Sequence, residues 1–259
     1  MRARGGFVLT GAGRVSSWRA CARGRRYCPG VLADRTSRRA LGRAASYGVA
    51  ASVPVLALGW LVRAESGAVA EADRATVAAA TRFTAARPAL RRALLVGQEA
   101  LAARWMNLAA TGVCAWAWRR RGLGARAAWA AGTVWGAWAL GLAAKGLVGR
   151  ARPVVEDVVT TVPGTSFPSG HAMNAAAVGV SLTALVRPLL RRRGRAAVAT
   201  AAVVLALVTA ADRVLLGVHH PSDVVGGLLL GGVVAGASAV GFHGWASAAP
   251  SGSAPRIEV

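Results

Sequence analysis

The sequence predicts an all-α, polytopic membrane protein, a bundle of six transmembrane helices. Two observations support this fold class: 54% of the 259 residues are hydrophobic, many of them in runs of membrane-spanning length, and short arginine clusters separate these runs. Apolar helices of about 20 residues cross a bilayer, and basic clusters anchor their cytoplasmic ends. The net charge of +22 would otherwise suggest nucleic-acid binding. Because the basic residues lie between apolar runs, we expect contact with a bilayer and no nucleic acid as partner.

Six apolar segments carry this prediction. The expected spans are residues 44–62, 99–118, 127–148, 172–190, 196–211 and 223–242. Between the first two, residues 67–98 mix alanine with charged side chains, a pattern that favours an amphipathic helix at the membrane interface over a further span. Pro88 is expected to divide this helix.

The two ends of the chain differ in composition from the six-span domain, which we expect over residues 44–242. Residues 1–43 are rich in arginine and predict an unfolded basic arm, although a transit peptide or an overextended start codon has the same composition. Residues 243–259 are expected to be a short tail. Arginine clusters after the second and fourth spans fall on the side of the basic arm, which predicts a multi-pass protein of the cell membrane with both termini cytoplasmic.

Three short polar segments interrupt the apolar chain, at residues 145–153, 167–171 and 212–223. The first two lie on one loop between the third and fourth spans, and the third segment follows two further crossings. All three therefore fall on the same face of the membrane. Since both termini are expected in the cytoplasm, that face is predicted to be extracytoplasmic.

The first polar segment contains two cations that can clamp an anion. Lys145 and Arg152 are seven residues apart, which on a helix is about two turns, or roughly 10 Å along one face. Lys145 is also the only lysine in a chain that otherwise uses arginine, which indicates that a compact ammonium is needed there. The alternative is a pair of interfacial cations that reach towards the headgroups.

The second polar segment, FPSGH, immediately precedes the fourth span. Ser169 is a good helix N-cap, so the amides of Gly170 and His171 are expected to point out of a positive helix end, a natural phosphate seat. On its own this segment is weak evidence, because a cap followed by an interfacial histidine is common.

The third polar segment contains Arg213, His219 and, four residues later, Asp223. A carboxylate at that spacing can hold an imidazole in one tautomer and leave its other nitrogen free to attack. Pro221 disfavours helix just before it, which puts His219 in a loop and Asp223 near the start of the sixth span. His220 is the competing candidate for the same role.

Three motifs with matching spacing and order resemble the signature of the type 2 phosphatidic acid phosphatase superfamily, which also includes the vanadium haloperoxidases. They are Lys145 with Arg152 and Pro153, Pro168 to His171, and Arg213 with His219 and Asp223. The resemblance covers about residues 145–223, and the six-span layout extends it to 44–242. One departure is Asp212, where the family often has serine, which puts in doubt a hydrogen bond from that position to phosphate.

The resemblance implies a mechanism that needs neither metal nor other cofactor. His219 would attack phosphorus to form a phosphohistidine, Asp223 would orient it, and His171 would protonate the departing oxygen and then help water to attack. The remaining residues would bind the phosphate oxygens: Lys145, Arg152, Ser169, Gly170 and Arg213. Three scattered cysteines and the absence of a clustered carboxylate site agree with a metal-independent enzyme.

The expected function is that of an integral membrane lipid phosphate phosphatase, acting on a polyprenyl diphosphate such as undecaprenyl diphosphate, or on phosphatidic acid. The loop after the first motif is too short to build a deep soluble pocket, which favours an amphiphilic substrate. A lipid phosphotransferase with the same site and a non-catalytic transporter or scaffold are the alternatives. His243 falls at the opposite end of the sixth span and is expected to be dispensable. The oligomeric state is left open.

Overall fold

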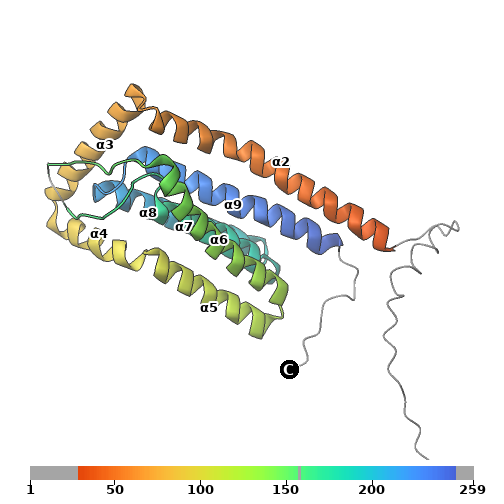
Figure 1. Ribbon diagram of the computed structural model, residues 1–259. Coiled ribbons are helices and arrows are strands. Elements are labelled where there is room, and N and C mark those ends of the chain that lie inside the picture. The colour runs from red at the N-terminus through yellow and green to blue at the C-terminus, as the bar shows by residue number, and fades with distance from the viewer. Residues whose placement is uncertain (1–28, 157–158, 249–259) are drawn as a thin grey trace, which may run out of the picture.

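The computed structural model describes residues 29–156 and 159–248, and these residues form helices without any β-strand (Figure 1). The helices are α2 (Pro29–Arg63), α3 (Gly67–Ala85), α4 (Pro88–Ala100), α5 (Ala103–Arg121), α6 (Gly124–Val148), α7 (Gly170–Val186), the short 3₁₀ turn η1 (Arg187–Leu189), α8 (Arg192–Leu215) and α9 (Pro221–Ala248). The predicted all-α class is confirmed for this part of the chain.

Five helical segments of the described chain are long and apolar enough to cross a membrane. They are residues 38–63, 124–148, 170–189, 192–215 and 221–244. The remaining predicted span, 99–118, corresponds to α5, which falls short because Arg104 and the arginines at 119–121 bound its uncharged stretch. That stretch is about 21 Å long at the helical rise, against about 30 Å of hydrocarbon. Length and composition therefore support five of the six predicted spans.

The ends of the predicted domain fall inside helices. Helix α2 begins at Pro29, so it includes residues 29–43 of the predicted basic arm, while residues 1–28 lie outside the described part of the chain. Alanine and arginine are good helix formers, and they carry the helix beyond its apolar stretch. Helix α9 likewise continues past the predicted tail boundary to Ala248, and residues 249–259 are not described.

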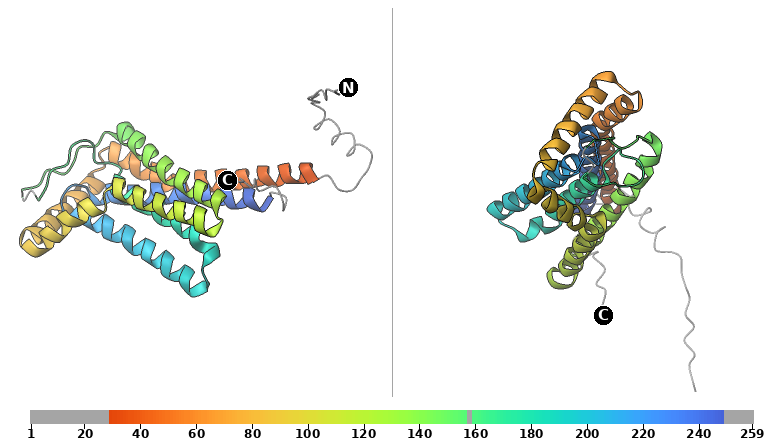
Figure 2. Two further views of the ribbon diagram at one scale, coloured as in Figure 1. Left: turned by 90° about the horizontal axis from the view of Figure 1, so that it is seen from below. Right: turned by 90° about the vertical axis from the view of Figure 1, so that its left-hand side faces the viewer.

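Helices α3 and α4 lie across one end of the bundle, as both views in Figure 2 show. The predicted division at Pro88 is confirmed: α3 ends at Ala85, and Pro88 begins α4, where its missing N–H costs no hydrogen bond. The loop between α6 and α7 and the loop between α8 and α9 are found at this same end, whereas the described ends of α2 and α9 lie at the other (Figure 1). The three polar segments therefore share one end of the molecule, as expected.

Helices α7 and α9 pack closely against each other below the end that carries the polar segments. A Cβ atom at Gly231 would fall 2.2 Å from the carbonyl oxygen of Met173, and one at Gly227 would fall 2.5 Å from that of Ser169. Both obstacles are backbone atoms, so only glycine lets the two helices approach this closely. Helix α2 covers the far side of α9, where Gly236 leaves room for Tyr47.

Replacement of Gly231 by alanine is expected to destabilise the bundle by about 1–3 kcal/mol, because the added methyl group pushes α9 away from the α7 backbone. Thermal unfolding of the purified protein in detergent measures this loss. Gly232→Ala is the matched control, since a Cβ there meets nothing within 4 Å. Equal stability of the two variants would contradict this account of the packing.

Candidate active site

Two cavities lie at the end of the bundle that carries the polar segments. The smaller, about 210 Å³, receives six of the eight predicted site residues: Lys145, Arg152, Gly170, His171, Arg213 and His219. Its remaining wall is largely apolar and includes Trp138 and Leu142 of α6. The larger cavity, about 890 Å³, lies beside the α2–α3 connection and shares only Arg152 with the smaller one. We assign the candidate site to the smaller cavity because the three motifs meet there.

The first motif reaches the cavity in a different way from the one expected. Helix α6 ends at Val148, and Gly149 follows in the left-handed conformation (φ 67°), so Arg152 lies in a loop and not two turns further along the helix. The prediction that Lys145 and Arg152 share one helical face is therefore wrong. Both side chains still line the cavity, because the loop folds back over the end of α6.

Main-chain carbonyl groups hold these two cations in place. Lys145 Nζ donates to the carbonyl oxygen of Thr165 at 2.9 Å, and Arg152 Nη1 donates to that of Val218 at 2.7 Å. Within the described chain neither cation has a carboxylate at ion-pair distance. Their charge is therefore available to an anion in the cavity.

The second motif forms the start of α7. Ser169 occupies the expected N-cap position, and its main-chain N–H donates to the carbonyl oxygen of Asp223 at 2.9 Å, which ties this loop to α9. The Ser169 hydroxyl, by contrast, is buried without a hydrogen-bond partner. Asn174, one turn into α7 and on the cavity wall, has both amide atoms buried without a partner. Unsatisfied buried polar groups are costly, so Asn174 favours a polar occupant of the cavity. Ser169 and Asp223 are the two predicted site residues that do not line this cavity.

In the third motif, the loop position of His219 and the helical position of Asp223 are as expected. His219 Nδ1 lies 3.4 Å from Asp223 Oδ2, too long for a well-formed hydrogen bond. Its Nε2 lies 3.3 Å from Arg152 Nη1. Because a guanidinium can only donate, this contact favours the tautomer whose lone pair is on Nε2 and whose proton faces Asp223.

The electrostatic surroundings keep this imidazole neutral. Burial lowers the pKa of His219 to about 4, since desolvation outweighs the opposing attraction of Asp223. An unprotonated ring near neutral pH has a lone pair available for attack. His219 therefore has the protonation state that a nucleophile requires.

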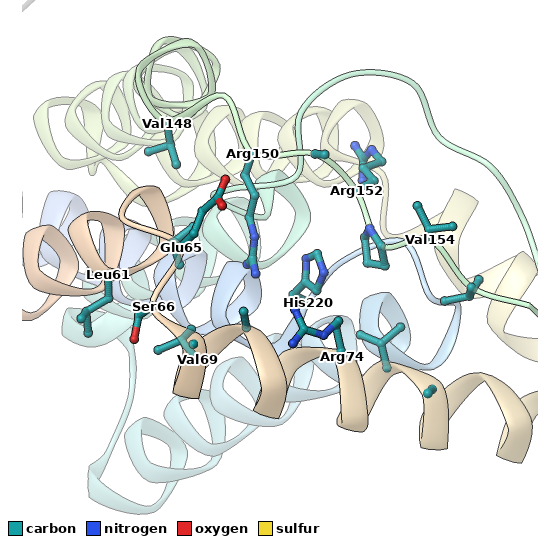
Figure 3. Close-up of a pocket in the computed structure, with 18 of the residues that line it drawn as sticks. Leu61, Glu65, Ser66, Val69, Arg74, Val148, Arg150, Arg152, Val154 and His220 are labelled. Carbon is teal, nitrogen blue, oxygen red and sulfur yellow. The ribbon is translucent and has the colours of Figure 1, made fainter.

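His220 competes with His219 for the same carboxylate. Its Nδ1 lies 3.3 Å from Asp223 Oδ2, and its main-chain N–H donates to that oxygen at 2.8 Å. The two rings nevertheless face different cavities: His219 lines the smaller one, while His220 lies on the wall of the larger one beside Arg74 and Arg150 (Figure 3). Only His219 shares its cavity with the other two motifs.

Arg213 lies in the last turn of α8 and is 1% exposed. Asp212, the departure from the family pattern, pairs with it: Arg213 Nε donates to Asp212 Oδ2 at 2.9 Å, and Nη2 donates to the same oxygen. The carboxylate thus offsets much of the Arg213 charge. Of the three predicted cations, Lys145 and Arg152 are left to supply the uncompensated charge.

Four residues near the site were not found from the sequence. Arg150 bridges Asp73 of α3 and Asp223, and Ser222 joins the same network. Gln98 of α4 accepts a hydrogen bond from Arg213 Nη1 at 3.2 Å. The sequence offers only a weak signal for two of them: Asp73 is one of only 10 acidic residues in the chain, and Arg150 lies two positions before a motif residue.

No group of three or more His, Cys, Asp or Glu side chains with the spacing of a metal site occurs among the described residues. The carboxylates near the smaller cavity are instead bound to arginines, with Asp212 on Arg213 and Asp223 on Arg150. His243 is at the far end of α9, where its Nε2 lies 3.1 Å from Arg126 Nη1. It does not line either cavity. Its dispensability stays a prediction.

Comparison with known proteins identifies relatives of this chain. Residues 126–245, which contain all three motifs, match the family model of the PAP2 superfamily. The decaprenylphosphoryl-5-phosphoribose phosphatase of Mycobacterium tuberculosis, from two strains, is 36% identical over 135 residues, which cover 50% of this chain and 67% of the relative.

A solved structure supports the same relationship. The transmembrane PAP2-type phosphatidylglycerolphosphate phosphatase of Bacillus subtilis superposes with a TM-score of 0.65 at 26% identity, over 74% of this chain and 94% of that protein. The family match, the identity to a phosphatase over two thirds of its length and the shared membrane fold agree with one another. The chain belongs to the PAP2 superfamily.

Proposed function

We propose that this protein is an integral membrane phosphatase that hydrolyses a lipid phosphate through a phosphohistidine on His219. One observation carries the proposal: the His219 imidazole, whose pKa is lowered by burial, lies in a small cavity with two cations, Lys145 and Arg152, that have no carboxylate partner among the described residues. A tetrahedral dianion fits such a site by charge, and the unpartnered Asn174 amide on the cavity wall offers a further hydrogen bond.

Catalysis proceeds in two in-line displacements. In the first, the Nε2 lone pair of His219 attacks phosphorus, while His171 donates a proton to the departing oxygen, so that a monoester releases a neutral alcohol and a diphosphate releases the protonated lipid monophosphate. In the second, His171 takes a proton from water, the water oxygen bonds to phosphorus, and the P–N bond breaks. The cations stabilise the charge that develops on the equatorial oxygens in both transition states.

Asp223 stabilises the intermediate by facing the Nδ1 proton of His219 while the ring carries positive charge. The 3.4 Å separation of Nδ1 and Oδ2 is expected to shorten when phosphate is bound, because catalytic hydrogen bonds tighten in the substrate complex. Gly170 contributes its main-chain N–H at the start of α7, where the helix dipole favours an anion.

The substrate is expected to be an amphiphile that enters sideways from the bilayer. The catalytic cavity of about 210 Å³ is large enough for a phosphate and its nearest atoms, and the apolar α6 side chains on its wall suit a lipid chain. The names of the two relatives indicate a lipid-linked sugar phosphate and a glycerolipid phosphate as substrates of those enzymes. We propose a phosphomonoester or diphosphate of a polyprenyl or glycerol lipid for this chain.

We further propose that α5 is the sixth span, with its terminal arginines reaching the interface, and that the site opens to the extracytoplasmic face. An impermeant thiol reagent should label a cysteine introduced at the exposed Val154 in intact cells. Labelling only after membrane rupture would contradict this orientation.

The direct test of function is phosphate release by the purified protein in detergent. The panel comprises decaprenylphosphoryl-5-phosphoribose, phosphatidylglycerol phosphate, phosphatidic acid and undecaprenyl diphosphate, each assayed with excess chelator. We expect release from at least one of them at the same rate with and without chelator. A requirement for added divalent metal would contradict the mechanism, and phosphate found on an acceptor other than water would identify a phosphotransferase.

A further inference from the structure

The carboxylate that faces the nucleophile is held by residues that are not among the predicted site residues of the three motifs. Arg150 Nη1 donates to Asp223 Oδ1 at 2.8 Å, and Arg150 Nη2 donates to Asp73 Oδ2 at 2.7 Å. Ser222 closes the network, since its main-chain N–H donates to Asp73 Oδ1 at 3.0 Å and its hydroxyl donates to Asp73 Oδ2. One guanidinium therefore bridges two carboxylates that come from α3 and α9.

Both carboxylates of this network are buried and depend on Arg150. Asp73 is 3% exposed and Asp223 is fully buried, so each carboxylate needs a partner to remain charged. The planar fork of Arg150 can serve both at once, which a lysine ammonium cannot do with the same geometry. Because Arg150 occupies Oδ1 of Asp223, the other oxygen, Oδ2, is the one left to face His219.

Helix α4 also contacts a residue of the catalytic cavity. The side chain of Gln98 accepts a hydrogen bond from Arg213 Nη1 at 3.2 Å. Helices α3 and α4 thus reach both sides of the cavity, although they precede residues 126–245, which match the family. Their contacts with the site go beyond the membrane-surface role expected of an amphipathic segment.

We propose that Asp73 and Arg150 are positioning residues for phosphoryl transfer. They hold Asp223 so that its Oδ2 faces His219, and they thereby keep His219 Nε2 aimed into the catalytic cavity. This inference rests on the proposed function. Since neither Asp73 nor Arg150 lines the cavity that receives phosphate, they act on the chemical step and leave substrate binding almost unchanged.

The first test is Arg150→Ala, assayed on the best lipid of the panel beside the wild type. We expect kcat to fall about 100-fold, as when a catalytic imidazole loses its orienting partners, with KM changed less than about threefold. Added guanidinium should restore at least about tenfold of this loss, because Arg150 lines the larger cavity and its place is open to a small planar cation (Figure 3). Arg74→Ala is the matched control, since Arg74 lines the same cavity but is not part of the network.

The second test is Asp73→Asn, alone and combined with Arg150→Ala. Asp73→Asn should lower kcat about tenfold, because Arg150 keeps its bond to Asp223 but loses its anchor on α3. The double variant should be no slower than Arg150→Ala alone, since residues of one network are not additive. If the alanine variant does not fold, Arg150→Lys replaces it, with an intermediate loss expected.

Three results would overturn the inference while leaving the phosphatase intact. They are wild-type kcat in Arg150→Ala, a loss that falls on KM, and a folded Arg150→Ala protein that guanidinium does not rescue. Additive losses in the double variant would separate Asp73 from Arg150 and also count against it. A wild type that releases no phosphate from any lipid would instead overturn the proposed function on which the inference rests.

Discussion

His219→Ala is expected to lower lipid phosphate turnover by at least about 10⁴-fold, whereas His220→Ala should keep most of it. The two histidines are neighbours and contact the same carboxylate oxygen of Asp223, at 3.4 and 3.3 Å. They differ in where they lie: His219 lines the cavity with Lys145 and Arg152, and His220 lines the larger one. Only the first ring can reach a phosphate held by those cations.

The measurement is phosphate release by purified wild type and both variants in detergent, at equal protein concentration and with melting temperatures recorded. His220→Ala serves as the matched control, because it removes the same ring next to the same carboxylate. Retention of turnover in His219→Ala, together with its loss in His220→Ala, would transfer the nucleophilic role to His220 and contradict the site described above.

His171→Ala carries the second largest expected effect, about 10³-fold on a lipid phosphate, because an alkoxide leaving group needs a proton in the transition state. The loss should depend on the leaving group. For p-nitrophenyl phosphate, whose phenolate leaves unaided, the first turnover should slow less than about tenfold. The second step then lacks its base, so one equivalent of nitrophenol should appear rapidly before turnover stops.

Rapid-mixing measurement of nitrophenol release compares this variant with the wild type. His243→Ala is the control for loss of a histidine elsewhere in the protein, since His243 lies at the far end of α9 and lines neither cavity. Equal slowing of His171→Ala on the lipid and on the nitrophenyl ester would show that His171 does not protonate the leaving group.

The convergence of the three motifs was predictable because membrane crossing imposes parity. Residues 145–153 and 167–171 lie at the two ends of the connection between α6 and α7, and two helices later the chain returns to the same end with residues 212–223. The start of α9 was equally predictable, because proline is tolerated in the first turn of a helix. Pro221 begins α9, so that His219 is in the loop and Asp223 is in the first helical turn. Local rules were sufficient for each of these positions.

Helix ends were harder to predict, because arginine favours helix and its long side chain tolerates the interface. The clusters at 119–121 and 192–195, expected to follow or separate spans, lie in the last turn of α5 and the first turns of α8. The opposite error occurred at Arg152, where helix was expected and Gly149 in the left-handed conformation ends α6 first. A single glycine in a sequence does not reveal which conformation it adopts.

The network around Arg150 could not be predicted from the sequence. Asp73 lies 77 residues from Arg150 and 149 from Ser222, and it belongs to a mixed-charge helix whose other charged residues, such as Glu71 and Arg74, are exposed. Helical periodicity does not distinguish a buried ion pair from a solvated one when the partner is on a distant element. Only the packing of α3 against α8 and α9 identifies Asp73 as part of the site.

The covalent intermediate offers the most direct test of the central claim. Wild-type protein, mixed with a ³²P-labelled lipid phosphate and quenched within the first turnover, should carry label in a linkage that is stable to alkali and labile to acid, as expected for phosphohistidine. Peptide mapping should locate the label on His219, and His171→Ala should accumulate more of it when the donor is ³²P-labelled p-nitrophenyl phosphate. Unlabelled protein under conditions of full turnover, or label on any residue other than His219, would contradict the account.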